Sequence, residues 1–198
     1  MNDQERQEKL EVGIREILTL LGENVYREGL KDTPSRVAKA LLFHTKGYKD
    51  DPMQYLKLFD SESIGQMIIV DNIDFYSKCE HHLETFYGHV HIGYIPNNKV
   101  LGVSKFSRII DVFSRRLQIQ ERMTQQVADF IMEKLKPQGV VIVVEGIHMC
   151  LRSRGVQKQN SQMISSAMLG RFEKEPGLRK EFLSIIKNKE RRINEQIR

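Results

Sequence analysis

The stretch FYGHVHIGYI, residues 86–95, decides the fold class because its central side chains, 89–94, alternate in character. One face carries apolar residues and the other carries histidine or glycine: Val90, Ile92 and Tyr94 against His89, His91 and Gly93. A period of two is typical of a β-strand with one face on a core. We therefore expect a sheet strand here, with His89 and His91 on the sheet surface.

Further strands and helices are predicted on both sides of this strand. Apolar runs at 67–70 and 73–76 precede it, and short strands follow at 100–103, 140–144 and 162–169. Between them lie two helical patterns, one with Ser104 as its N-cap and one from about Gln118 to Lys136. The order β-β-α-α-β-β predicts an α+β fold: a four-stranded antiparallel sheet with two helices on one face. Its two free edges favour pairing with other subunits.

The first third of the chain reads as helical. An apolar stripe over residues 5–21 predicts an amphipathic helix, and Asp32-Thr33-Pro34 starts a second one. A third short helix is expected from Asp51-Pro52 to about Phe59, and a closing helix begins at Pro176. We expect an N-terminal helical extension over residues 1–62 and a sheet-containing domain over residues 63–198.

The composition indicates a soluble globular protein. Of 198 residues, 40% are hydrophobic and 29% charged, and no apolar run approaches the roughly 20 residues of a membrane span. No secretory segment follows the polar N-terminus, which predicts a cytoplasmic protein. The net charge of +5 favours anionic partners, but zinc-finger spacing and RNA-binding aromatic runs are absent, so no nucleic-acid partner is expected.

Two short clusters contain the residues suited to metal chemistry. Cys79-Glu80-His81-His82 and His148-Met149-Cys150 hold both cysteines of the chain, and thiolate and imidazole are the ligands that zinc prefers. Three ligands, Cys79, His82 and Cys150, would leave an open catalytic position, whereas His148 as a fourth would close the site. The alternative is that the cysteines pack as small apolar side chains.

The remaining histidines and a group of cations complete the candidate site. His81 and His148 could move protons beside a bound metal, or could simply support the ligands. Ser104, Lys105 and Arg108 lie on the first turn of a predicted helix, where backbone N–H groups also attract phosphate. Arg152 and Arg154 follow the second metal cluster. The alternative for these cations is a solvated charged face.

Gln120-Glu121 opens the second predicted helix. A carboxylate accepts two parallel hydrogen bonds from adjacent N–H donors, as guanine offers them at N1 and its exocyclic amine. The alternative is that Glu121 complements the helix dipole.

Five motifs, taken together and in order, resemble the GTP cyclohydrolase I family: Cys79–Leu83, Gly88–Pro96, Gly102–Lys105, Gln118–Thr124 and His148–Cys150. The resemblance runs from about Asp32 to Leu183. It implies the tunnelling fold, in which β-β-α-α-β-β units close into a shared barrel, and a toroidal homodecamer. The chain departs from the common family pattern at Glu84-Thr85, where Val-Pro is frequent. That change alters charge and loop stiffness near the metal and leaves the ligands intact.

The resemblance also implies a role for each site residue. Cys79, His82 and Cys150 correspond to zinc ligands, with an open fourth position. His148 corresponds to the acid that protonates guanine N7, and His81 to a second acid/base. The substrate contacts implied are Gln120 and Glu121 for guanine, and Ser104, Lys105, Arg108 and Arg154 for the triphosphate, with Ser104 also near the sugar rearrangement.

The implied activity is that of a zinc hydrolase. It opens the guanine ring of GTP at C8, releases formate and recyclises the product to 7,8-dihydroneopterin triphosphate, the first step of tetrahydrofolate and pterin biosynthesis. The rival interpretations are a non-catalytic oligomer with structural zinc, a tunnelling-fold enzyme acting on a related pterin or deazaguanine, and a nucleic-acid binder.

Overall fold

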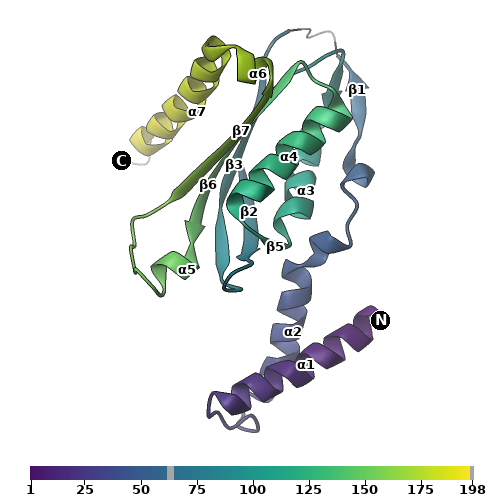
Figure 1. Ribbon diagram of the computed structural model, residues 1–198, viewed down its shortest axis with the longest axis vertical. Helices are drawn as coiled ribbons and strands as arrows, with labels where there is room; N and C mark the ends of the chain where they lie inside the picture. The colour runs from purple at the N-terminus through teal and green to yellow at the C-terminus, as the bar shows by residue number, and fades with distance from the viewer. Residues whose placement is uncertain (62–64, 197–198) are drawn as a thin grey trace. The chain divides into compact units, whose positions relative to one another are not determined.

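The computed structural model describes residues 1–61 and 65–196, with side chains through residue 187, and the chain forms two compact units (Figure 1). These units are Met1–Lys46 and Gly47–Arg198. The predicted boundary between residues 62 and 63 falls outside the described residues. None of the described helices has the length and apolar character needed to cross a membrane.

The first unit is a pair of helices, as predicted. Helix α1 (Asp3–Leu20) begins at Asn2, whose side chain accepts a hydrogen bond from the Glu5 N–H while the Glu5 carboxylate accepts one from the Asn2 N–H. This reciprocal capping satisfies two backbone donors that the first helical turn otherwise leaves unpaired. Helix α2 (Thr33–His44) carries Pro34 in its first turn and packs on α1, with Ala38 fully buried.

The second unit opens with short elements that the sequence predicted only in part. After η1 (Lys46–Tyr48), the segment predicted as a helix from Asp51 to Phe59 forms a 3₁₀ turn, η2 (Pro52–Tyr55), and then strand β1 (Leu58–Asp60). Strand β1 pairs antiparallel with β4 (Lys99–Leu101). The helical prediction was wrong over 58–59, and the sequence did not indicate this strand because its pairing partner lies about forty residues away.

The main sheet has five strands in the order β5-β2-β3-β6-β7. The four predicted strands are confirmed as an antiparallel series, and a two-residue strand runs parallel to β2 at one edge. Their bounds are β2 (Ile68–Cys79), β3 (Thr85–Ile95), β5 (Leu117–Gln118), β6 (Gly139–His148) and β7 (Met163–Gly170).

Helices α3 (Val103–Ser114) and α4 (Gln120–Leu135) pack on one face of this sheet and enclose the main core, which confirms the α+β class. Phe106, Ile109 and Ile131 are almost fully buried there. Each such side chain contributes roughly 1.5–3 kcal/mol through removal of apolar surface from water. The N-cap of α3 is Gly102, so the prediction of Ser104 as the cap was wrong: Ser104 lies inside the first turn.

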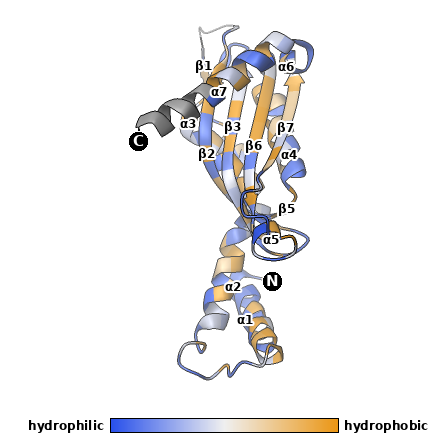
Figure 2. Cartoon of the chain, turned by 90° about the vertical axis from the view of Figure 1, so that its left-hand side faces the viewer, coloured by the Kyte–Doolittle hydropathy of each residue, from blue (hydrophilic) through white to orange (hydrophobic). Residues whose placement is uncertain are grey.

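The opposite face of the sheet is covered at one end by α6 (Arg171–Lys174) and α7 (Pro176–Gln196), as Figures 1 and 2 both show. A second apolar cluster lies there, centred on Val141, Phe172 and Phe182. A Cβ at Gly93 would lie 2.7 Å from the Phe182 ring, so this close packing requires glycine. His91 is on the same face and is 3% exposed, which corrects its prediction as a surface residue.

The strand pairing fixes which segments meet at each end of the sheet. Phe86 at the start of β3 faces Ser77 of β2 and His148 of β6, so the segments after Cys79 and after His148 leave the sheet at the same end. Helix α5 (Met149–Arg152) continues from β6 at that end. Strands β1 and β4 lie at the other end (Figure 1).

Candidate metal centre and active site

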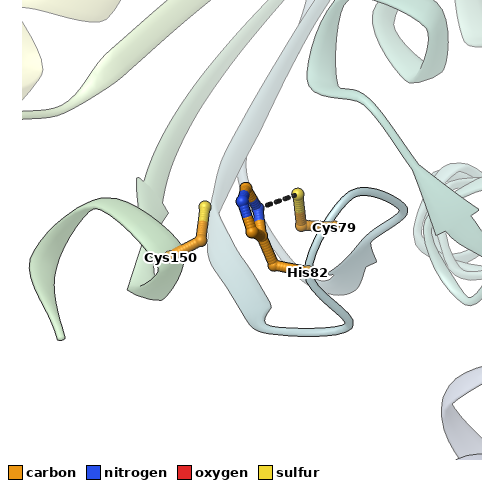
Figure 3. Close-up of side chains that lie close together, drawn as sticks. All are labelled: Cys79, His82 and Cys150. Atoms are coloured by element: carbon orange, nitrogen blue, oxygen red, sulfur yellow. Dashed lines mark hydrogen bonds between the residues drawn. The ribbon is translucent and has the colours of Figure 1, made fainter. Parts of the chain in front are cut away.

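Cys79, His82 and Cys150 form a compact set of possible metal ligands (Figure 3). One ligand atom from each residue lies within 4.8 Å of the others, and the Cys79 Sγ and His82 Nδ1 are 3.6 Å apart. Cys79 ends β2, His82 lies in the following turn, and Cys150 comes from α5. The structure therefore brings together the three residues that the sequence indicated, from two segments seventy residues apart.

The turn that carries His82 is held by the backbone of Cys79. The Cys79 carbonyl accepts hydrogen bonds from the N–H groups of His82 and Leu83, and the Cys79 N–H donates to the Glu84 carbonyl at 2.8 Å. Leu83 adopts a left-handed conformation at φ 56° to close this turn. These bonds place Cys79 and His82 side by side before any ion is considered.

The electrostatics of the trio favour a cation. Burial, the neighbouring Cys79 and the charge of Glu84 all raise the pKa of the Cys150 thiol. Without a cation, the closeness of the two sulfur atoms opposes ionisation of the thiols. A metal ion between them would stabilise both thiolates, so the same closeness would then favour metal binding. The donor set of two sulfurs and one imidazole nitrogen fits a soft or borderline divalent metal such as zinc.

His148 ends β6, two residues before Cys150. Its ring stacks on Phe86 with centroids 4.6 Å apart and planes inclined by 6°, and its Nε2 is 2.9 Å from the Gln120 Oε1. Burial lowers the pKa of His148, and the nearby negative charge of Glu121 partly offsets that effect. A neutral, oriented imidazole next to a metal site is suited to proton exchange.

His81 lies on the solvent side of the same turn. Its side chain is 63% exposed, its Nδ1 is 3.8 Å from the Cys79 Sγ, and its Nε2 is 3.9 Å from a Glu80 carboxylate oxygen. It is therefore next to the metal ligands and free of the packing that constrains His148.

Gln120 and Glu121 differ sharply in surroundings although they are adjacent. The Gln120 side chain is buried and hydrogen-bonded to groups of β6 and β7, whereas Glu121 is exposed at the start of α4. Of the two side chains, Glu121 is the one open to a ligand.

Comparison with known proteins agrees with this geometry. The profile of the family described as GTP cyclohydrolase I matches residues 10–187. The chain belongs to the GTP cyclohydrolase I family. It is similar to the GTP cyclohydrolase 1 of Campylobacter lari, with 50% identity over 91% of this chain and 95% of that protein. The human GTP cyclohydrolase 1 is 52% identical over 87% of this chain and 69% of its own length.

In this GTP cyclohydrolase I family member, the residues predicted to bind the triphosphate lie on two separate segments. Arg154 follows α5 and lies at the same end of the sheet as Cys150. Ser104 and Lys105 lie in the first turn of α3 and Arg108 lies at its middle; the helix starts just after β4 and ends next to β5, the strand paired with Lys78 and Cys79. A 12-residue helix is about 18 Å long, so Ser104 and Lys105 lie most of a helix length from the end of α3 that is next to β5.

Two further features of this GTP cyclohydrolase I family member were not predicted as part of the site. Phe86 provides the surface on which His148 stacks, and Glu80 forms an ion pair with Arg122 of α4. The alternation of 86–95 marked Phe86 as a strand residue, but its contact with His148 depends on the pairing of β3 with β6. Glu80 directly follows Cys79 in the sequence, but nothing in the sequence indicated that its carboxylate pairs with Arg122.

Proposed function

We propose that this chain catalyses the hydrolytic opening of the guanine imidazole ring of GTP at C8, releases formate, and recyclises the product to 7,8-dihydroneopterin triphosphate. This would be the first step of tetrahydrofolate and pterin biosynthesis. The observation that carries the proposal is the trio Cys79, His82 and Cys150 in a chain of the GTP cyclohydrolase I family. His148, two residues before Cys150, and Glu121, whose charge acts on His148, support it.

Zinc is the proposed ion, held by Cys79, His82 and Cys150 with its fourth position open. When bound, zinc supplies Lewis acidity and lowers the pKa of water toward neutrality. The chain's own residues then bind and orient the substrate and move its protons.

Each side chain has a role that matches its surroundings. His148, stacked and hydrogen-bonded, protonates guanine N7 as the ring opens. His81, exposed next to Cys79, acts as the second acid/base during opening of the imidazole and ribose rings. Glu121 accepts two hydrogen bonds from the guanine N1 and amine groups, and Gln120 contributes to the same pocket through its backbone.

The triphosphate is bound by Arg154 together with Ser104, Lys105 and Arg108, and Ser104 also lies near the sugar rearrangement. Because the first turn of α3 lies at the end of the helix opposite β5, we propose that these three residues reach the substrate from a second copy of the chain. Residues 63–198 would form a tunnelling-fold catalytic domain, and the free edges at β5 and β7 would pair between copies in a barrel within a homodecamer.

Formate release from GTP, measured with zinc-loaded and chelator-treated protein, tests the activity. We expect formate only from the zinc-loaded form, and its absence there would refute the proposal.

Replacing His148 by Ala should leave zinc bound and reduce ring opening by at least about 100-fold, in the range typical of lost acid-base catalysis. Sedimentation of the same samples measures the assembly, and a monomer that turns over GTP would contradict the shared site.

A further inference from the structure

The side-chain amide of Gln120 has a fixed orientation. It is 1% exposed, and its Nε2 lies 3.0 Å from the carbonyl oxygen of Val144 and 3.0 Å from that of Met163. A backbone carbonyl can only accept hydrogen bonds, so both contacts require the NH₂ end of the amide at this position. The opposite orientation would bring an amide oxygen against two carbonyl oxygens inside the protein, with no donor between them.

Hydroxyl groups next to the amide support the same orientation. The Thr124 hydroxyl is 2.7 Å from the Gln120 carbonyl, to which it donates its one proton. The Ser165 hydroxyl is 2.7 Å from Thr124 Oγ1, so Ser165 must donate in that contact. Its oxygen is then a third acceptor next to Gln120 Nε2, at 3.1 Å, and shares the two protons of that NH₂ group with the two carbonyls. Every donor in this small network therefore has an acceptor.

The orientation of Gln120 determines the state of His148. With the NH₂ group directed at β6 and β7, the Gln120 Oε1 faces the His148 Nε2 at 2.9 Å. An amide oxygen is an acceptor, so the His148 Nε2 must carry a proton. A neutral imidazole has one N–H, which leaves the lone pair on Nδ1.

We propose that Gln120 is a positioning residue that holds His148 in its Nε2–H tautomer, so that Nδ1 is the nitrogen that first takes a proton from the attacking water and then gives it to guanine N7. The second half of this statement rests on the proposed function; the tautomer itself does not. It gives Gln120 a task distinct from contact with guanine.

The surrounding strands keep the ring and the amide in register. Phe86 supports one face of the imidazole. Gly146 lies under the contact, and a Cβ there would be 2.1 Å from the Gln120 Oε1. The absence of a side chain at residue 146 thus makes room for the amide oxygen, and Gly146→Ala is a way to displace that oxygen without changing Gln120.

The tautomer is measured by ¹⁵N spectra of zinc-loaded protein with ¹⁵N-labelled histidine rings, and the His148 signals are assigned by their loss in His148→Asn. We expect a protonated Nε2 and an unprotonated Nδ1 in the wild type. Gln120→Met and Gly146→Ala should each change this pattern and lower kcat for GTP by about 10–100-fold, as loss of an outer hydrogen bond typically does. The KM and the zinc content should change by less than about threefold.

Gln125→Met, the same change at an exposed position of α4, is the control and should match the wild type in spectrum and turnover. An Nδ1–H tautomer in the wild type would overturn the proposal, as would an unchanged tautomer in both variants. Should Gln120→Met fail to fold, the wild-type spectrum and Gly146→Ala still decide the question. A wild type that shows the expected tautomer and releases no formate would refute the proposed function and leave the tautomer assignment standing.

Discussion

Phe86 combines two roles at the scale of a single residue, since it is fully buried in the core and also supports the His148 ring. It packs edge-on against Phe75 at 5.7 Å as well. Replacement by leucine keeps most of the volume and removes both aromatic contacts. We expect Phe86→Leu to lower the free energy of unfolding by about 1–2 kcal/mol, measured by urea denaturation, and to lower GTP turnover more than zinc affinity.

Phe130→Leu provides the matched control for this change. Phe130 is also buried and has an aromatic neighbour, Phe113, at 5.6 Å, but it lies in the middle of α4, away from His148. A similar loss of stability with normal turnover is expected. Equal losses of turnover in the two variants would show that the His148 stack has no specific effect.

The sequence could indicate candidate residues where the chemistry is local to a short motif. Cys79 and His82 share one turn and Cys150 holds the only other thiol, so spacing and residue type brought them forward as possible ligands, and the structure places the three together. The choice of three ligands rather than four came from the family resemblance. The role of Gln120 could not be predicted in this way, because its partners Val144 and Met163 lie on two strands far along the chain. The same holds for His91, whose burial depends on which face of the sheet the closing helices cover.

At the scale of elements, the turn that carries His82 is tied to the start of α4 by side chains. Glu80 pairs with Arg122, and the Arg122 Nε donates to Gln118 Oε1 at 3.0 Å. The Gln118 amide in turn donates to Gln126 and to the Phe113 carbonyl, both at 2.9 Å. The Glu80 N–H also donates to the Gln118 carbonyl. The turn is thereby attached to two helices.

Breaking this attachment should weaken metal binding more than folding. We expect Arg122→Gln to raise the zinc dissociation constant by roughly 10-fold in a chelator competition. The free energy of unfolding should change by less than about 1 kcal/mol, because the ion pair is partly exposed. Lys99→Gln, which breaks the ion pair with Asp60 at the other end of the sheet, is the control. Equal zinc affinities in the two variants would contradict this role.

Helix α6 contains an ion pair whose effect depends on pH. Hydrogen bonds from Arg171 to Glu175, at 2.6 and 2.9 Å, hold the pKa of Glu175 below its ordinary value of 4.5. A carboxyl with a lowered pKa in the folded state stabilises the fold above its unfolded pKa and loses that effect as pH falls through its folded pKa.

Glu175→Gln should therefore lower the Tm relative to wild type at pH 7, and the difference should shrink as pH falls below about 4.5. Glu173→Gln, at an exposed position of the same helix, should follow the wild type throughout. A Tm difference that stays constant with pH would assign the effect of Glu175→Gln to packing.

Helices and strands were predictable where a hydrophobic pattern extends over many residues. They were missed where a strand depends on pairing with residues far away in the sequence. The stripes of α1, α2 and α4 and the alternation of β3 needed no tertiary information. Strand β1, three residues long, exists because β4 is beside it, and the start of α3 moved to Val103 because the preceding backbone turns at Gly102. Local propensity describes neither effect.

At the scale of the whole molecule, the second unit contains every apolar cluster of the described sheet. We expect a chain of residues 47–198 to unfold in one cooperative transition and to bind zinc, measured by circular dichroism and metal analysis. Its first residue is retained because the Gly47 backbone hydrogen-bonds to Arg115 and Arg116.

A shorter chain that begins at residue 57 provides the comparison for this truncation. It lacks Tyr48, which hydrogen-bonds to Leu117, and Tyr55, which lies under the Arg108 guanidinium. It should be clearly less stable. A 47–198 chain without a cooperative transition would mean that the second unit does not fold without residues 1–46.

The position of Lys105 in the first turn of α3, at the end of the helix opposite β5, has a consequence for assemblies made from two different variants. If phosphate binding and ring opening in one site come from different copies, a chain with Cys150→Ser and a chain with Lys105→Ala are each inactive for different reasons. When the two variants are refolded together, they should complement each other. Some sites then combine the intact metal ligands of the Lys105→Ala chain with the intact phosphate-binding residues of the Cys150→Ser chain. We expect formate from the mixture and none from either variant alone. A mixture that releases no formate would place ring opening and phosphate binding in the same copy.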